Sequence, residues 1–364
     1  MRIVFASGGT GGHIYPALAI AEEMRDRFDS FNPLFVGTRA GLESEIIGEL
    51  GYNLRFIVSG PMRGRRFWGR IGTLLGMAAG IVQSLIIVSR FKPDLVVGFG
   101  GYASASVVIA ASLLGKAIVL QEQNSIPGLT NRLLSRFAER IYLGFAHASR
   151  YFRNSGKLLH TGNPLRSVIT REYEGNAAAG FGLNRDLPIL LVFGGSQGAS
   201  SLNRAALEYI RSGARVQLII QTGKRDYSMM KSELSGFRNM VFVTDYIKSI
   251  REAYQAADIV LSRAGALSVS EIAAVGIPSI LVPYPFSADR HQVENARYLE
   301  EAGGAVVVDD SEISGEELGS IMDNILSDRQ KIRNMEEAAR SRGISDAARR
   351  IVDDIEVILE RKSS

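Results

Sequence analysis

Two stretches decide the fold because they repeat one pattern: R-I-V-F-A-S-G-G-T-G-G-H at residues 2–13 and P-I-L-L-V-F-G-G-S-Q-G-A-S at residues 188–200. Each begins with an apolar run, continues through a glycine-rich turn and leads into a helical pattern. A strand, a glycine turn and a helix in this order form the opening unit of a Rossmann-like domain. Since the unit occurs twice in 364 residues, we predict two similar α/β domains rather than one large core.

Short apolar runs alternate with helical patterns along the rest of the chain. Continuous apolar strands separated by helices are typical of parallel sheets covered on both faces. The predicted strands are Ile3–Ala6, Pro33–Val36, Leu95–Phe99, Ala117–Gln121, Arg140–Leu143, Ile189–Phe193, Gln217–Gln221, Met240–Val243, Ile259–Leu261, Ser279–Val282 and Ala305–Val308. The predicted helices include Pro16–Phe28, Thr130–Arg136, Ala199–Arg211, Ile247–Ala256, Ser268–Ala274 and His291–Glu300.

The domain boundary is expected near T-G-N-P-L-R at residues 161–166, which precedes a polar stretch. We therefore predict an N-terminal domain over residues 1–163 and a C-terminal domain over residues 164–345. A final helix over residues 346–364 has a pattern that would allow it to pack on either domain.

Charge is distributed unevenly between the two halves. Residues 1–160 hold 18 Lys and Arg against 10 Asp and Glu, a net charge of +8, whereas the remainder holds 24 against 28, a net charge of −4. The positive half is expected to meet an anionic partner, and charge alone allows nucleic acid or an anionic membrane. The chain has no cysteine and no signal-peptide pattern before its first strand, so we predict a cytoplasmic protein.

One region, residues 63–89, favours the membrane as that partner. M-R-G-R-R-F-W-G-R at residues 62–70 places four arginines around two aromatic residues, and no charged residue follows until Arg90. Arginines and aromatics beside an apolar stretch suit contact with anionic lipid at the headgroup level, although a solvated basic loop explains them equally well. The apolar stretch is long enough to span a bilayer. Its glycines, and the buried-strand pattern that follows, favour a buried or membrane-facing helix instead.

The glycine turns predict a site for a diphosphate. Such turns expose backbone N–H groups at the start of a helix, where an anion is favoured. A third turn, G-F-G-G-Y-A-S, lies at residues 98–104. The first turn lacks the Lys-Ser/Thr of a P-loop, and Ile14 stands where a dinucleotide-binding motif has its third glycine. Close packing alone would explain one such turn, but three turns favour a ligand.

A second constellation, S-R-A-G-A-L-S-V-S-E at residues 262–271, suits a nucleotide. Its small residues allow a ligand to approach, and the Glu271 carboxylate can accept two ribose hydroxyls, although a solvated or capping glutamate is the alternative. Gln292 and Asn295 share a helix face, where their amides suit sugar hydroxyls. The sequence has no D-x-D or H-E-x-x-H motif, so we predict that helix dipoles and hydrogen bonds stabilise a diphosphate without metal.

Seven motifs occur in order: A-S-G-G-T-G-G-H-I-Y-P-A-L-A, G-F-G-G-Y-A-S, E-Q-N-S-I-P-G-L-T-N, G-N-P-L-R, G-G-S-Q-G-A, Q-T-G-K and S-R-A-G-A-L-S-V-S-E. Their combination resembles the MurG family, the bacterial N-acetylglucosaminyltransferases of peptidoglycan synthesis in glycosyltransferase family 28. The resemblance implies a GT-B fold, in which two Rossmann-like domains face each other across a cleft and the last helix crosses back to the first domain. It also implies transfer of GlcNAc from UDP-GlcNAc to the 4-hydroxyl of MurNAc in lipid I, with inversion and without a metal or other cofactor.

The same resemblance implies the partners and the location. UDP-GlcNAc and lipid I would be the substrates, no nucleic acid would be bound, and cell-wall synthesis proteins are further candidate partners. The enzyme would be cytoplasmic and peripheral on the inner face of the cell membrane, which it would touch through residues 63–89.

In the C-terminal half, the resemblance assigns residues to the donor. Ile247 would meet uracil through its backbone, Glu271 would bind the ribose hydroxyls, and Gln292 would bind the GlcNAc hydroxyls. Around the diphosphate or sugar it places Ser196, Gln197, Ala266, Leu267, Ser268, Val269 and Ser270.

In the N-terminal half, the resemblance assigns residues to the acceptor. Near its diphosphate and sugar it places Thr10, Gly11, Gly12, Tyr102, Glu122 and Asn124, with Arg166 close to one of the two diphosphates. An inverting transfer needs a base for the acceptor hydroxyl, and His13 is our candidate because a histidine can be neutral at working pH. Glu122 is the rival base, and His13 would otherwise bind a phosphate or cap the helix.

The sequence departs from the family at Gln121, where family members usually have histidine. A histidine base is therefore absent from that position. Three other functions stay open: a GT-B transferase for another lipid or natural-product acceptor, a UDP-GlcNAc 2-epimerase, and a non-catalytic nucleotide-sugar sensor.

Overall fold

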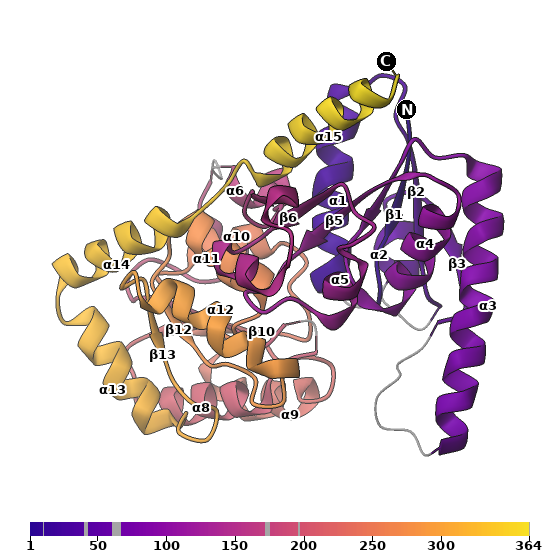
Figure 1. The fold of residues 1–364 in the computed structure, drawn as a ribbon. Coiled ribbons are helices and arrows are strands. Elements are labelled where there is room, and N and C mark those ends of the chain that lie inside the picture. The colour runs from indigo at the N-terminus through magenta and orange to yellow at the C-terminus, as the bar shows by residue number, and fades with distance from the viewer. Residues whose placement is uncertain (10, 40–42, 60–66, 172–174, 196, 364) are drawn as a thin grey trace. The chain divides into compact units, whose positions relative to one another are not determined.

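A computed structural model describes residues 1–9, 11–39, 43–59, 67–171, 175–195 and 197–363. The chain divides into two compact units (Figure 1). The first comprises Met1–Arg166 together with Asp346–Ser364, and the second comprises Ser167–Ser345. The last helix thus belongs to the first unit, although its sequence pattern alone would suit either.

The first unit is built on a seven-stranded parallel sheet with the order β3-β2-β1-β4-β5-β6-β7. Its strands are β1 (Arg2–Ala6), β2 (Asn32–Gly37), β3 (Asn53–Phe56), β4 (Leu95–Gly98), β5 (Ala117–Glu122), β6 (Arg140–Leu143) and β7 (Leu158–His160). All five strands predicted in this half are present. The sequence does not predict β3 and β7, because these edge strands are short and partly exposed and so lack a continuous apolar run.

Helices cover both faces of this sheet, because successive strand residues point to opposite sides. Ile3 and Phe5 of β1 belong to one core, and Val4 and Ala6 belong to the other. The helices are α1 (Gly11–Arg27), α2 (Glu43–Glu49), α3 (Phe67–Phe91), α4 (Gly101–Leu113), α5 (Leu129–Leu134) and α15 (Ala347–Ser363), with 3-10 turns η1 (Ala146–Tyr151) and η2 (Ser155–Lys157). No helix among the described residues has the length and hydropathy needed to cross a membrane.

Helix α1 begins at Gly11, five residues before the predicted start at Pro16. Gly11 and Gly12 form its first turn instead of a loop, and Pro16 lies buried inside it. Glycine is a weak helix former, which conceals this start in the sequence.

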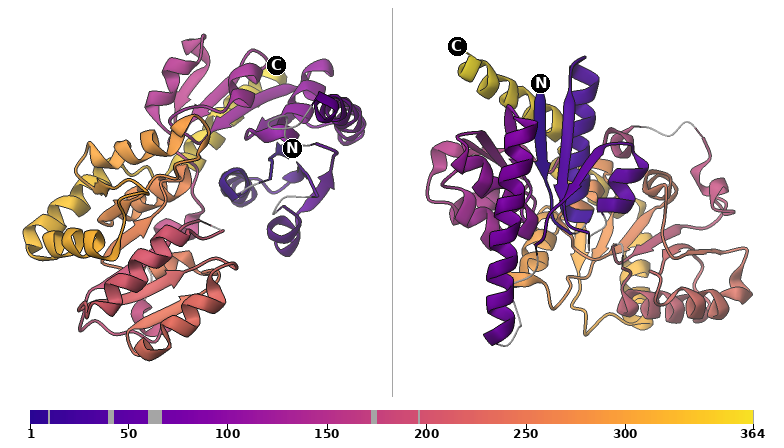
Figure 2. Two further views of the ribbon diagram at one scale, coloured as in Figure 1. Left: turned by 90° about the horizontal axis from the view of Figure 1, so that it is seen from below. Right: turned by 90° about the vertical axis from the view of Figure 1, so that its right-hand side faces the viewer.

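Helix α15 is held on the first unit by apolar contacts and by charge. Its residues Ile351 and Ile355 share a core with α1, and Figure 2 shows the helix in yellow beside the N-terminal strand and helix. Arg27 Nη1 lies 2.6 Å from Asp353 Oδ1. Asp354 Oδ2 accepts hydrogen bonds of 2.9 Å from both Arg140 Nε and the buried Tyr142 hydroxyl. These contacts are specific to this helix and explain why it groups with the first unit.

The second unit is built on a six-stranded parallel sheet with the order β10-β9-β8-β11-β12-β13. Its strands are β8 (Ile189–Phe193), β9 (Gln217–Gln221), β10 (Val241–Thr244), β11 (Ile259–Ser262), β12 (Ser279–Leu281) and β13 (Ala305–Val307). Each lies within one residue of its predicted bounds, because all six strands carry continuous apolar runs.

The helices of the second unit are α6 (Ser167–Thr170), α7 (Ala177–Gly180), α8 (Ser200–Arg211), α9 (Tyr227–Glu233), α10 (Ile250–Ala256), α11 (Ala266–Val275), α12 (His291–Glu300), α13 (Gly315–Leu326) and α14 (Arg329–Arg342), with η3 (Ser235–Phe237) and η4 (Ala288–Arg290). Helix α8 packs against α13, and α11 packs against α14. Helix α10 begins at Ile250 rather than at the predicted Ile247.

The two sheets share one order over six strands, to which the first unit adds β7 at an edge, and in both sheets the order reverses once. The reversal lies between β1 and β4 in the first unit and between β8 and β11 in the second. In open α/β sheets, ligands bind beyond the carboxyl ends of the strands at such a switch point. The fold therefore marks one candidate site in each unit.

Candidate functional site

In the first unit, the first and third glycine turns meet at the switch point. A Cβ atom on Gly8 would lie 3.4 Å from Cα of Gly101, and one on Gly101 would lie 3.3 Å from Cα of Gly8. Gly100 and Gly101 also have φ angles of +90° and +79°, which side-chain-bearing residues rarely adopt. The loops after β1 and β4 therefore contact each other backbone to backbone.

His13 packs against the contact between these two loops, and its ring has a defined orientation. Its Nδ1 lies 2.7 Å from the carbonyl oxygen of Gly8. A carbonyl oxygen only accepts hydrogen bonds, so Nδ1 carries the proton and Nε2 is the nitrogen that can take one up. Nε2 lies 3.5 Å from the position of a Cβ on Gly100. The tautomer is thus the one that a base at the switch point requires.

The rival base, Glu122, has a different environment. Its side chain is buried, and Oε1 accepts a 2.9 Å bond from the backbone N–H of Asn124. Oε2 accepts bonds from Gly128 N at 3.1 Å and Asn131 Nδ2 at 2.9 Å. Burial raises the pKa of the Glu122 carboxyl, and these N–H donors act in the opposite direction. The contacts make Glu122 the acceptor that shapes the loop after β5, and its use as a base stays a prediction.

Gln121 belongs to a buried amide network. Its Nε2 donates to Asn163 Oδ1 at 3.1 Å, and its Oε1 accepts from Gln123 Nε2. Asn163 Nδ2 donates in turn to the Gln123 carbonyl at 3.0 Å. This position therefore joins β5 to the segment that leads out of the first unit.

Four further acceptor candidates lie at helix starts or beside them. Tyr102 is the second residue of α4 and is 38% exposed. The Arg166 guanidinium lies over the Tyr15 ring, 4.9 Å from its centroid, and a Cβ on Gly11 would lie 3.2 Å from the same ring. Gly12 stands in the first turn of α1. Thr10 lies outside the described residues.

In the second unit, the loop after β8 is built on still closer backbone contacts with the loop after β9. A Cβ on Gly198 would lie 2.0 Å from the carbonyl oxygen of Thr222, and one on Gly223 would lie 2.2 Å from that of Gln197. The Gln197 side chain is exposed. Ser196 lies outside the described residues.

Gln221, the first residue of the Q-T-G-K motif, connects this loop to Ile247. Its Nε2 donates to the Gly195 carbonyl at 2.8 Å, and its Oε1 accepts from the Ile247 backbone N–H at 2.8 Å. This bond holds Ile247 in a loop, which explains why α10 begins three residues later. Because the Ile247 N–H already donates to Gln221, the backbone of Ile247 would bind a nucleobase through its carbonyl oxygen.

The first turn of α11 follows Gly265 at the end of β11, as the sequence predicts. N–H groups in the first turn of a helix have no partner within the helix, so they suit an anion. The prediction that Val269 lies around the diphosphate or sugar needs a correction. Its side chain is fully buried, and its N–H donates to the Gly265 carbonyl at 2.9 Å. Within residues 266–271, the half-buried residues are Leu267, Ser268, Ser270 and Glu271.

On α12, Gln292 and Asn295 have different roles. Gln292 Oε1 accepts a 2.9 Å bond from the backbone N–H of Tyr284. Asn295 is fully buried and donates to the Ala264 carbonyl at 3.2 Å, so it anchors the α11 motif rather than facing a sugar. The periodicity that puts both amides on one face of a helix does not reveal which of them the core covers.

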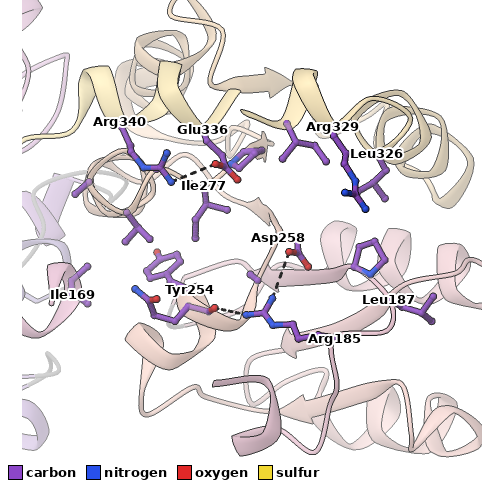
Figure 3. Close-up of a pocket in the computed structure, with 18 of the residues that line it drawn as sticks. Ile169, Arg185, Leu187, Tyr254, Asp258, Ile277, Leu326, Arg329, Glu336 and Arg340 are labelled. Carbon is purple, nitrogen blue, oxygen red and sulfur yellow. Dashed lines mark hydrogen bonds and ion pairs between the residues drawn. The ribbon is translucent and has the colours of Figure 1, made fainter. Parts of the chain in front are cut away.

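A cavity of about 680 Å³ lies elsewhere in the second unit (Figure 3). Pro188, Asp258 and Pro278 line it at the amino ends of three strands. It therefore lies at the opposite edge of the sheet from the glycine loops. Among the described residues, no three His, Cys, Asp or Glu side chains gather as metal ligands, and metal independence stays a prediction.

Similarity to known proteins identifies the class. Residues 3–143 match the glycosyltransferase family 28 N-terminal domain, and residues 189–351 match the glycosyltransferase family 28 C-terminal domain. Two Rossmann-like units with these domains define a two-domain glycosyltransferase of the GT-B type. The chain belongs to glycosyltransferase family 28.

The similarity extends over the whole chain. A relative from Chlorobaculum tepidum, named UDP-N-acetylglucosamine--N-acetylmuramyl-(pentapeptide) pyrophosphoryl-undecaprenol N-acetylglucosamine transferase, is 41% identical over 98% of both chains. A crystal structure of Acinetobacter baumannii MurG has a TM-score of 0.76 at 25% identity, over 98% of this chain and 99% of that one. A UDP-GlcNAc 2-epimerase from Neisseria meningitidis has a TM-score of 0.69 at 13% identity, over 98% and 99% of the chains, and shares only the fold.

Substituting the buried carboxylate with an amide tests its role in the loop. In Glu122→Gln, one end of the side chain becomes an NH₂ group that faces N–H donors, whichever way the amide is turned. We expect the free energy of unfolding to fall by about 1–3 kcal/mol. Urea unfolding followed by the fluorescence of Trp68, the single tryptophan, measures this in the first unit.

The matched control is Glu139→Gln, which removes an exposed carboxylate of the same unit that pairs with Lys362. We expect it to change stability by less than about 1 kcal/mol. Equal effects of the two substitutions would contradict the structural role of Glu122.

Proposed function

We propose that this chain transfers GlcNAc from UDP-GlcNAc to the C4 hydroxyl of MurNAc in lipid I, forming lipid II and UDP for peptidoglycan synthesis. The observation that carries the proposal is the full-length similarity to a transferase whose name states this donor and this acceptor, 41% identical over 98% of both chains. The site geometry supports it, because each unit carries a glycine-built loop at the carboxyl edge of its sheet, after β1 in the first unit and after β8 in the second.

The donor would bind the second unit through four kinds of contact. The Ile247 carbonyl would accept from uracil N3–H, and Glu271 would accept from the ribose hydroxyls. The first turn of α11, around Ser268, would hold the diphosphate with its N–H groups and its dipole. Gln292 would bind hydroxyls of the GlcNAc ring, and Gln197 would reach the phosphates or the sugar from the loop after β8.

In the proposed reaction, the C4 hydroxyl oxygen of MurNAc attacks the anomeric carbon of GlcNAc. The bond from this carbon to the β-phosphate oxygen breaks, and UDP leaves with the electron pair. The hydroxyl proton passes to Nε2 of His13, which the Nδ1–H bond to Gly8 keeps available in the neutral ring. Attack from the face opposite the leaving group converts the α-linked donor into a β-linked product. Dipoles of α11, rather than a metal, would stabilise the UDP charge.

The reaction is tested with labelled UDP-GlcNAc, incubated with and without lipid I. We expect UDP to be released only with lipid I, the label to enter the lipid, and EDTA to leave the rate unchanged. Label that stays in an epimerised nucleotide sugar would overturn the proposal, and so would binding without UDP release. A panel of other lipid acceptors separates this function from that of a related transferase.

Removal of the proposed base should slow the chemical step. For His13→Ala we expect kcat to fall by roughly a few hundredfold or more, the usual range for lost general-base catalysis. UDP affinity, measured by calorimetry, should stay nearly unchanged because the donor site lies in the other unit. His147→Ala, which changes an exposed histidine of the same unit, is the control. A loss of less than tenfold in His13→Ala would remove His13 from this role.

We also propose that the enzyme is peripheral on the inner face of the cell membrane and contacts it through residues 63–89. Helix α3 exposes Val82 and Ile86, and Val58, whose backbone N–H donates to Gln83 of α3, is exposed as well. Arg63, Arg65 and Arg66 lie outside the described residues, just before this helix. A segment that combines arginines with exposed apolar side chains suits an anionic lipid surface.

The arginines are tested with vesicles that contain anionic lipid. Replacing Arg63, Arg65, Arg66 and Arg70 with serine should weaken vesicle binding strongly at low salt, because each basic residue contributes about 1 kcal/mol at such a surface. The control replaces four exposed arginines of the second unit with serine: Arg204, Arg215, Arg225 and Arg238. Unchanged binding of the first variant at low salt would exclude this contact.

A further inference from the structure

Glu271 of α11 is held by a residue that belongs to neither the motif nor the glycine loops. The hydroxyl of Tyr254, on α10, donates a hydrogen bond of 2.9 Å to Oε2 of Glu271. The Tyr254 side chain is only 1% exposed, whereas Glu271 is half-buried. A buried phenol thus contacts a carboxylate that reaches the surface at the candidate donor site.

The Tyr254 ring is buried and packs against a second aromatic ring. It packs edge-on against Phe193, the last residue of β8, with the ring centroids 6.0 Å apart. On another side it lines the cavity together with Ile169 and Ile277 (Figure 3). Because the ring has few alternative positions in this packing, its hydroxyl is a fixed donor.

The Tyr254 hydroxyl remains the donor of this hydrogen bond as the pH rises. Burial, and then the negative charge of Glu271, raise the pKa of the Tyr254 hydroxyl well above its ordinary value. The phenol therefore stays protonated and donates, and the carboxylate accepts. Each carboxylate oxygen can accept two hydrogen bonds, so Glu271 keeps acceptor capacity for a diol.

We propose that Tyr254 is a positioning residue for the donor: its hydroxyl fixes the Glu271 carboxylate in the orientation that accepts the 2′- and 3′-hydroxyls of ribose. The site would thereby select ribonucleotides over 2′-deoxyribonucleotides. This inference rests on the proposed function, in which Glu271 binds the ribose.

The physical reason is preorganisation. A glutamate side chain has several rotamers, and ordering it when the ligand binds costs conformational entropy. With the phenol in place, the carboxylate is already ordered, so more of the interaction with the diol appears as affinity. A ligand that lacks the 2′-hydroxyl gains less from this order.

The test measures calorimetric affinities for UDP and for 2′-deoxy-UDP. For Tyr254→Phe, which keeps the ring, we expect UDP affinity to fall about 3–10-fold and 2′-deoxy-UDP affinity to fall less than twofold. The preference of the protein for UDP should shrink accordingly. In steady-state kinetics, KM for UDP-GlcNAc should rise while kcat at saturating donor stays within about twofold.

Two further variants complete the experiment. In Glu271→Gln, the added change Tyr254→Phe should weaken UDP less than twofold, because the two residues act as one unit. Tyr298→Phe is the control, since it removes another hydroxyl of this unit, which donates to the Arg342 carbonyl. We expect this control to leave both affinities unchanged.

The outcomes separate the inference from the proposed function. Equal weakening of both ligands by Tyr254→Phe, or additive effects of the two substitutions, would overturn the positioning role and leave Glu271 as the ribose ligand. An unchanged preference for UDP in Glu271→Gln would instead overturn the assignment of Glu271 itself. A lower melting temperature with the preference retained would show that Tyr254 only stabilises the fold.

Discussion

The close approach of backbone to backbone between neighbouring loops is the constraint on which the rest of the structure depends. In the first unit Gly8 and Gly101 are in van der Waals contact, and in the second unit a Cβ on Gly198 would lie 2.0 Å from the Thr222 carbonyl oxygen, which leaves no room for a side chain. These contacts bring loops from neighbouring strands to one point at the carboxyl edge of each sheet. His13 acquires its position from this arrangement, because it directly follows the loop after β1.

Side chains behind the loops then fix the groups that face the ligand. Glu122 orders the loop after β5, Gln221 fixes Ile247 and the loop after β8, and Tyr254 holds Glu271. Each of the three is buried and uses its polar atoms on the protein itself. Mutations in this layer are expected to alter binding without removing any direct contact with substrate.

The sequence predicts most of the fold because the inner strands are continuous apolar runs, as in Ile189–Phe193. Edge strand β3 escapes prediction because its residues alternate between exposed and half-buried positions. The sequence also predicts the glycine loops and Glu271 as parts of a site. Glycine exposes the backbone to a ligand, and a carboxylate can accept hydrogen bonds from hydroxyls. Tyr254 escapes because it lies 17 residues from Glu271 on another helix. Local spacing carries no information about a pairing of this kind, which depends on how two helices pack.

The amide network around Gln121 also has a consequence for the chain's tolerance of acid. Gln121, Gln123 and Asn163 hold the end of β5 to the segment before Arg166 without any ionisable group. A histidine in the place of Gln121 would gain a proton as the surroundings became acidic, and a buried positive charge would then strain this junction. With glutamine there, the amide network takes up no proton, and acid acts on the end of β5 through the neighbouring Glu122, whose pKa burial raises.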